Sequence, residues 1–256
     1  MVNNLRKRHP RMGCRKLYAT LKDEFIAHNI KIGRDRFIDL LRESNLLIKP
    51  RKKYHQTTNS RHWMRKYSNL IKDVEPLGPN HIIVSDITYW KTKNKHLYIS
   101  FVTDVYSKMI LGANVGDTLE SIETVKALKQ ALKSITPQSF EMIHHSDRGV
   151  QYCSSKYVNL LKKHNIKISM TEGSDPLDNS IAERINGIIK GEYLYDYEVK
   201  SLDEARKILN SVVKLYNNER PHSSLNYMKP RDVHFGKLDR EIKKMWKTYY
   251  KKQDVF

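Results

Sequence analysis

The chain has 256 residues, a formal net charge of +19 and 39% hydrophobic residues, which is typical of a folded protein with a core and a charged surface. No apolar run is long enough to cross a bilayer, and no apolar stretch follows the basic N-terminus, so a signal peptide is not expected. The two cysteines, Cys14 and Cys153, form no disulfide framework, which favours a reduced cytoplasmic compartment.

Charge is distributed unevenly along the chain. Residues 1–75 hold 19 Lys and Arg against 7 Asp and Glu, residues 231–256 hold 8 against 4, and the stretch between them is nearly neutral. A basic head and tail on a neutral body favour a phosphate-rich polymer, and therefore nucleic acid, as the partner. The alternative is a basic surface that binds no ligand.

The first 75 residues predict short helices. Residues 14–25 and 34–45 each place apolar side chains on one face, and the turn between them contains a glycine. This arrangement predicts a helix-turn-helix-like DNA-binding region. Residues 60–73 predict a further helix, on which Trp63 and Tyr67 lie four positions apart and are expected to pack.

A basic run precedes this last helix. Its residues Arg51, Lys52 and Lys53 suit contacts with backbone phosphates. A solvated linker is the alternative.

A Pro- and Gly-containing boundary near residues 75–80 separates the head from a stretch with a different pattern. Strands are predicted over residues 81–90, 96–106, 109–116, 140–146 and 167–170. Helices are predicted over residues 121–135, 154–166, 180–195 and 202–219, so that three strands in succession are followed by alternating helices and strands. The order β-β-β-α-β-α-β-α predicts an α/β fold with a mixed sheet and helices on its faces.

Three carboxylates occupy positions that this order brings together. Asp86 lies in the first strand, Asp147 follows the fourth, and Glu183 lies in the first turns of a late helix. Such a cluster suits phosphoryl transfer with two Mg²⁺ ions, which take oxygen ligands. Taken singly, each acid could instead cap a turn or form an ion pair.

The stretch FEMIHHSDRGVQYCSSKY, residues 140–157, also suggests a zinc site. Zinc usually needs four ligands at local, recurrent spacing, and this stretch matches no such pattern. Strand alternation places His145 on the side of Asp147, where it is expected to touch substrate or water. His144 is expected to pack.

Four motifs in order, SDIT, HSDRGVQYCS, DNSIAERINGIIKGE and YNNERPHSSL, resemble those of DDE transposases and retroviral-type integrases. The resemblance is strongest to the second-frame (OrfB) transposases of the insertion-sequence three family and covers residues 76–230. It implies an RNase H-like catalytic core with Asp86, Asp147 and Glu183 as the metal-binding catalytic residues, 35 residues separating the last two. Mg²⁺ or Mn²⁺, as two ions with substrate bound, is the implied cofactor.

Residues beside these acids have open roles. The resemblance implies a polar role at DNA for Lys190, seven positions after Glu183 on the same helix face. Arg148 is expected to meet either a phosphate or a neighbouring carboxylate. Asn179 is expected to cap the following helix or, alternatively, to contact DNA.

The resemblance implies a transposase of three parts: a DNA-binding head (1–75), a catalytic core (76–230) and a basic helical tail (231–256). It would cut at the ends of an insertion element and join the freed 3′-hydroxyl to another phosphodiester, passing through a circular intermediate. Double-stranded DNA and further copies of the chain are the expected partners. Family members also use an upstream-frame segment with a coiled coil, which is not seen here. The alternatives are an RNase H-like nuclease that never joins, or a non-catalytic DNA-binding partner or repressor of a longer transposase.

Overall fold

The computed structural model describes residues 1–48, 62–92, 96–135, 140–172 and 179–238. Five strands form one sheet in the order β3-β2-β1-β4-β5. Their bounds are β1 (Ile82–Lys91), β2 (His96–Asp104), β3 (Ile110–Gly116), β4 (Ile143–Ser146) and β5 (Lys167–Met170).

The sheet is mixed, as the sequence predicts. β1, β2 and β3 form an antiparallel meander, and β4 and β5 continue it in parallel from the other side of β1. In the register of β1 and β4, Ser85 pairs with Ser146. Each serine directly precedes an aspartate, so the register alone brings Asp86 and Asp147 to neighbouring positions.

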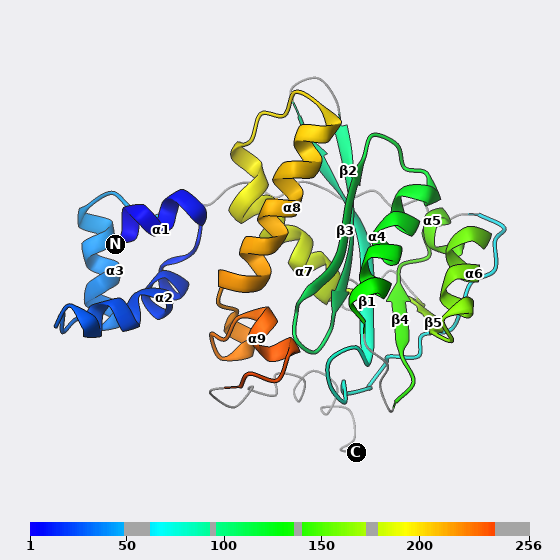
Figure 1. Cartoon of the computed structure of the whole chain (residues 1–256), viewed down its shortest axis with the longest axis horizontal. Coiled ribbons are helices and arrows are strands. Elements are labelled where there is room, and N and C mark those ends of the chain that lie inside the picture. The colour runs from blue at the N-terminus through cyan, green and yellow to red at the C-terminus, as the bar shows by residue number, and fades with distance from the viewer. Residues whose placement is uncertain (49–61, 93–95, 136–139, 173–178, 239–256) are drawn as a thin grey trace, which may run out of the picture.

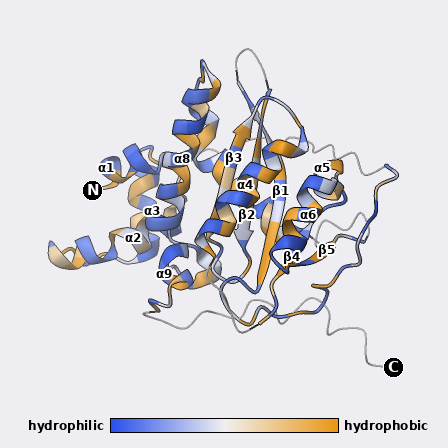
Figure 2. Cartoon of the chain, turned by 45° about the vertical axis from the view of Figure 1, so that its right-hand side comes forward, coloured by the Kyte–Doolittle hydropathy of each residue, from blue (hydrophilic) through white to orange (hydrophobic). Residues whose placement is uncertain are grey.

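Helices cover both faces of the sheet (Figure 1). On one face lie α4 (Ser121–Ser134), α5 (Val150–Cys153) and α6 (Ser155–Lys163), and on the other lie α7 (Ser180–Ile188) and α8 (Leu202–Glu219). The strands are largely hydrophobic, whereas the helices alternate hydrophobic and hydrophilic residues (Figure 2). This is the pattern of an α/β fold whose sheet is buried on both faces.

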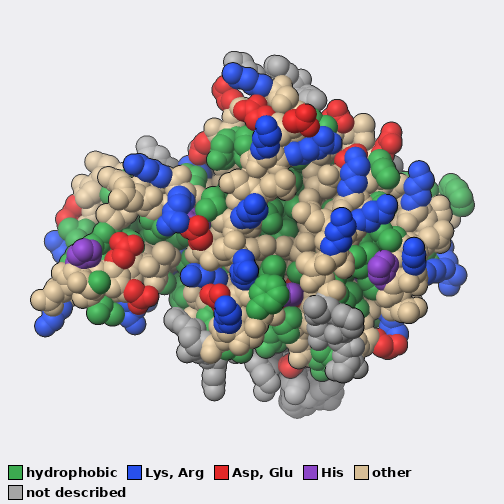
Figure 3. All heavy atoms as spheres, viewed as in Figure 1, with side chains coloured by type: hydrophobic (Ala, Val, Ile, Leu, Met, Phe, Trp, Pro, Cys, Tyr) green, Lys and Arg blue, Asp and Glu red, His purple; other side chains and the backbone are tan. Residues whose placement is uncertain are grey.

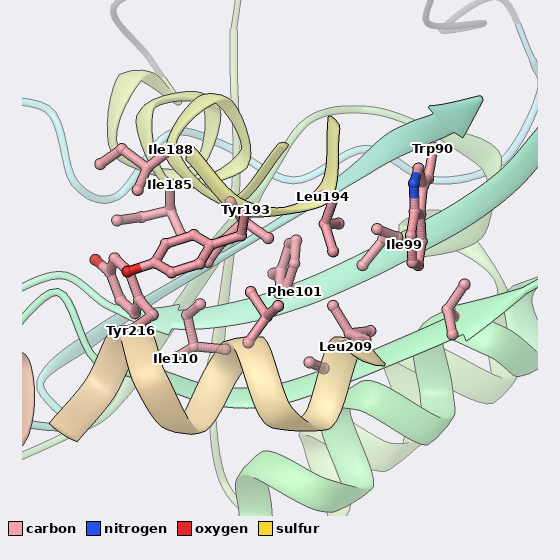
Figure 4. Packing of buried hydrophobic residues seen from close by; sticks show 14 of the residues in the cluster. Trp90, Ile99, Phe101, Ile110, Ile185, Ile188, Tyr193, Leu194, Leu209 and Tyr216 are labelled. Atoms are coloured by element: carbon pink, nitrogen blue, oxygen red, sulfur yellow. The ribbon is translucent and has the colours of Figure 1, made fainter. Parts of the chain in front are cut away.

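Alternating side chains of β2 supply the two cores. Ile99 and Phe101 pack against α7 and α8, and Val102 packs against α4 on the opposite face. In the α7–α8 layer, Tyr193 and Tyr216 lie among aliphatic side chains from the helices and the sheet (Figure 4). β1 and α7, which carry two of the three predicted acids, therefore rest on one continuous hydrophobic layer.

The head contains α1 (Val2–Arg8), α2 (Cys14–Ala27) and α3 (Arg34–Glu43). The two predicted helices are confirmed, and α1 precedes them. They enclose a separate small core, in which the rings of Tyr18, Phe25 and Phe37 contact one another.

The predicted helix over residues 60–73 is wrong. Residues 62–73, here called the edge segment, are irregular and run along β5, the last strand of the sheet. The backbone N–H of Leu70 donates to Ser169 Oγ at 2.8 Å, and the N–H of Met170 donates to the Ser68 carbonyl at 3.4 Å. Tyr67 packs partly as expected, but Trp63 does not: its side chain is 92% exposed.

The late helix is interrupted. α7 ends at Ile188 and passes into a π turn, η1 (Ile189–Tyr193), and a 3₁₀ turn, η2 (Leu194–Asp196). After α8 come η3 (Ser223–Leu225) and α9 (Pro230–His234). Most of the predicted basic tail helix lies outside the described residues. Among the residues that the structure describes, no helix has the length and apolar character needed to cross a membrane.

Candidate active site

Asp86 is the most buried of the three predicted acids, with 4% of its surface exposed. Its Oδ1 accepts from the backbone N–H of Ile87 at 2.8 Å, and its Oδ2 accepts from Asn186 Nδ2 at 2.7 Å. Burial, together with the charges of Asp147 and Glu183, raises its pKa to about 8. Without a cation, this carboxyl is therefore largely protonated at neutral pH.

Asp147 directly follows β4 and begins the turn into α5. Its Oδ1 accepts from the backbone N–H of Gly149 at 2.9 Å. A Cβ atom at Gly149 would lie 3.0 Å from that same oxygen, so glycine gives the carboxylate room to fold back over the turn. The turn thereby fixes Asp147 at the carboxyl end of β4.

Glu183 lies in the first turn of α7 and is partly exposed. Its pKa is raised by burial and then by Asp147. The pKa of Asp86 responds to both other acids. Residues from β1, the turn after β4 and α7 thus share one electrostatic environment, as the sequence predicts.

The three acids do not form a closed ligand set in this conformation. Within the described ranges, no three His, Cys, Asp or Glu side chains are grouped closely enough to hold a metal ion. The donor chemistry nevertheless fits a hard divalent cation, because all three donors are carboxylates that repel one another. A cation among them would offset the repulsion that raises the pKa of Asp86.

Asn186 belongs to the site and was not singled out from the sequence. It is buried one turn after Glu183, and its amide holds Asp86 Oδ2. The one signal in the sequence was its spacing: residues at i and i+3 share a helix face. An asparagine in a helix carries no chemical mark of its own, so only the contact with β1 identifies it.

Lys190 also points toward β1. Its Nζ donates to Thr88 Oγ1 at 3.0 Å, two positions along the strand from Asp86. Burial lowers the pKa of Lys190, and the nearby Asp86 partly opposes this shift. The structure therefore brings Lys190 to the acidic cluster, and its contact with DNA stays a prediction.

Arg148 lies between Asp147 and the edge segment. Its carbonyl oxygen accepts from His62 Nε2 at 2.6 Å. Its Nε is buried and has no hydrogen-bond partner among the described residues. Its role, at a phosphate or at a neighbouring carboxylate, stays a prediction.

Asn179 occupies the N-cap position of α7, but its side chain makes no capping hydrogen bond. Its Nδ2 instead donates to the Ser85 carbonyl at 3.3 Å and thereby ties the helix start to β1, and the alternative, a contact with DNA, stays a prediction. His145 is completely buried, with Nδ1 2.8 Å from Ser169 Oγ, its neighbour in β5. The expected position of His145 beside the substrate is therefore wrong, because the edge segment covers this face of the sheet, where the N–H of Leu70 donates to Ser169 Oγ.

His144 packs as predicted. Its Nε2 contacts Ser85 Oγ at 2.8 Å and Tyr157 OH at 2.9 Å, and burial lowers its pKa to about 3, so the ring is neutral. The two histidines contact different elements, His144 residues of β1 and α6 and His145 a residue of β5. Arg51, Lys52 and Lys53 lie outside the described residues.

Comparisons with known proteins agree with this geometry. Two integrase core domain models match residues 76–176 and 164–230. A 31 kDa protein of insertion element IS600 from Shigella sonnei is 35% identical over 84% of this chain and 80% of its own length. The transposase of insertion sequence IS629, also from Shigella sonnei, is 29% identical over 88% of this chain and 74% of its own length.

Solved structures show the same fold. The catalytic core domain of HTLV-2 integrase, solved in complex with magnesium, has a TM-score of 0.50 and 23% identity, and the match covers 62% of this chain and 99% of that one. The integrase in a simian T-cell lymphotropic virus intasome has a TM-score of 0.55 and 20% identity, over 90% of this chain and 77% of that one. The predicted RNase H-like mixed sheet is thereby confirmed.

Proposed function

The chain belongs to the insertion-element transposases that carry an integrase core domain, and from this membership we propose that it cuts and joins DNA at the ends of such an element. Asp86, Asp147 and Glu183 are the proposed catalytic residues. The observation that supports the proposal is the electrostatic coupling of these three carboxylates, which belong to β1, the turn after β4 and the first turn of α7.

The proposed reaction has two displacements at phosphorus. In the first, water attacks a phosphodiester and a 3′-hydroxyl leaves. In the second, that hydroxyl attacks another phosphodiester, so that one P–O bond forms as another breaks and no bond to the protein is made. A circular element is the expected product when the second phosphodiester belongs to the other end of the same element.

Mg²⁺ or Mn²⁺ fits the proposed site, since oxygen donors suit both ions and the HTLV-2 integrase core was solved with magnesium. Asp86, Asp147 and Glu183 would hold one or two such ions, which would supply charge stabilisation at the reacting phosphate. Asp86 has to release its proton first, since its pKa is about 8. Asn186 keeps the Asp86 carboxylate turned toward α7 through its 2.7 Å hydrogen bond.

Cationic residues around the acids would hold the DNA. Arg148 directly follows Asp147, and Lys190 Nζ lies at Thr88, two positions along β1 from Asp86. Further Lys and Arg side chains are spread over the face that α4, α6 and α8 present (Figure 3). The basic head and the run Arg51–Lys53 are proposed to bind the element end away from the cut.

Two ends must be joined, so a dimer or larger assembly on DNA is proposed, and an upstream-frame segment is a proposed additional partner. The site of action would be the bacterial cytoplasm, at the nucleoid.

The test is Mg²⁺-dependent strand joining on oligonucleotides that carry the element's end sequence. Asp147→Asn should abolish both cleavage and joining, while Asp203→Asn, a matched change at an exposed residue of α8, should leave both intact. Joining that survives Asp147→Asn would overturn the proposal. Cleavage without any joined product would favour the nuclease, and metal-independent binding without cleavage would favour the repressor.

A further inference from the structure

Trp63 is the most exposed large hydrophobic residue in the described part of the chain, at 92%. Tryptophan is the largest apolar side chain, and leaving it in water forgoes the gain from its burial. The residues on either side of Trp63, His62 and Met64, are both anchored to the rest of the fold.

The edge segment divides its side chains between two sides. His62, Met64 and Tyr67 face inward: His62 holds the Arg148 carbonyl at 2.6 Å, and the other two pack against the core around α5 and α6. Trp63 and its neighbours Arg65 and Lys66 are exposed. The inward anchors therefore fix the outward side chains beside the turn that carries Asp147.

The charge around Trp63 is positive. Arg65 lies over the ring of Tyr67 at 5.2 Å, which places its guanidinium close to the segment. Burial raises the pKa of Cys153 and Asp147 adds to this, whereas Lys66 and Arg148 oppose it. Lys66 and Arg148 therefore both lie near this turn. In Figure 1 the segment, drawn in cyan, passes outside β5 and α6.

An exposed aromatic ring among cations suits single-stranded nucleic acid, whose bases stack on the ring while the cations meet phosphates. In an intact duplex the base faces are already stacked and offer no such surface. We infer that Trp63 stacks on an unpaired DNA base next to the phosphodiester at the Asp147 site. This inference rests on the proposed function, and it gives the edge segment a specific role, which is to hold a frayed strand at the point of reaction.

Fluorescence tests the contact directly. The sequence has three tryptophans; Trp90 is buried, and Trp246 can be removed by Trp246→Phe. The measurement is made with a chelator present, which prevents cleavage. A duplex with a short single-stranded 3′ tail of thymidines should then quench the emission from Trp63. A blunt duplex of the same sequence, bound at saturation as judged by anisotropy, should quench it far less.

Affinity provides a second readout. Trp63→Ala should weaken binding of the tailed duplex about ten-fold and leave the blunt duplex unchanged, while Trp63→Phe should keep most of the affinity. Leu77→Ala, which removes another exposed apolar side chain (69%) before β1, is the matched control and should change neither.

Three results would overturn the inference. One is unchanged Trp63 emission on the bound tailed duplex, and another is equal loss of affinity for both duplexes in Trp63→Ala. Concentration-dependent shielding of Trp63 without DNA is the third, because it would make the surface a contact between copies. Each leaves the proposed function standing, whereas failure of the wild-type chain to bind either duplex would overturn both proposals.

Discussion

Arg220 and Glu192 form a buried two-point ion pair between the end of α8 and the π turn that follows α7. Arg220 Nε and Nη2 each donate to Glu192 at 2.7 Å, and the arginine side chain is 1% exposed. Lys16 of the head joins the same carboxylate at 2.7 Å. One glutamate therefore connects the head, the core and the turn that carries Lys190.

Removing Arg220 should be strongly destabilising. Burial disfavours the charged form of Glu192 and raises its pKa. The hydrogen bonds and charge of Arg220 have a larger effect in the other direction, so the pKa of Glu192 lies below its usual range. Arg220→Met leaves that carboxylate buried with Lys16 alone, and a loss of about 3 kcal/mol in the free energy of unfolding is expected. Urea denaturation measures this loss in the free energy of unfolding.

The matched control for this change is Arg206→Met, which breaks an exposed pair with Asp203 on the same helix and should cost at most about 0.5 kcal/mol. Because the pKa of Glu192 is depressed, the difference between the two variants should be present above about pH 4.5 and shrink as pH falls through the folded-state value. Equal losses in both variants at pH 7 would contradict the interpretation.

Asp86 should make the metal-free protein less stable as pH rises. Its pKa of about 8 in the folded chain lies far above the usual range of an aspartate, so the folded state keeps a proton that the unfolded state releases. The stabilisation is complete below about pH 4 and is lost as pH approaches 8. Asp86→Asn cannot ionise and should be more stable than the parent at pH 8 by about 1–3 kcal/mol.

Unfolding curves in chelator at several pH values check this expectation. The two proteins should converge in stability near about pH 4, where Asp86 is neutral in both states. Parallel curves across the whole range would show that Asp86 does not carry the raised pKa.

Mg²⁺ should stabilise the folded chain through the three acids. At one hundred times its dissociation constant, a ligand that binds only the folded state adds about 2.7 kcal/mol. The gain should be larger at pH 8 than at pH 6, because Asp86 must lose its proton. Thermal unfolding with and without Mg²⁺ measures it; Asp147→Asn should lose most of the gain, and chelator should reverse it. A gain of the same size in Asp147→Asn would place the ion elsewhere.

Lys190 should contribute one phosphate contact. Lys190→Met is expected to weaken binding of end DNA and to reduce the slope of log affinity against log salt by about 1. Lys200→Met, a change at an exposed lysine in the loop before α8, serves as the control. If both variants keep the wild-type slope, Lys190 acts within the protein, through Thr88, and not on DNA.

The sequence predicted the elements whose periodicity is strong. β5 and α8 have the predicted bounds, and Asp86 and Asp147 are neighbours because β1 pairs with β4. The edge segment was misassigned because Trp63 and Tyr67 have helical spacing, while its actual conformation depends on contacts with Ser169 and Arg148, about 85–100 positions away. The local sequence pattern does not indicate contacts with residues so far away in the chain.

Some roles followed only from three-dimensional neighbours. Asn186, Lys16 and Arg220 look like ordinary helix and loop residues, and each acquires its role from a carboxylate on another element. His145 shows the reverse: strand alternation predicts its face of the sheet, but alternation does not say whether another segment covers that face, as the edge segment does here.

The π turn after α7 has a consequence for how this chain tolerates insertions and deletions. Such turns hold one more residue than a regular helical turn, and each residue advances an α-helix by about 100°. Deleting one residue of the π turn before Glu192 would remove that extra residue, so a regular helical turn could form and the residues after it would keep their present directions relative to Glu183. Deleting one residue between Glu183 and Ile188, where the helix is regular, would instead rotate everything after it by about 100°, so that Tyr193 and Leu194 would leave the core and Glu192 would turn away from Arg220. The chain should therefore tolerate a deletion in the π turn better than one in the helix before it.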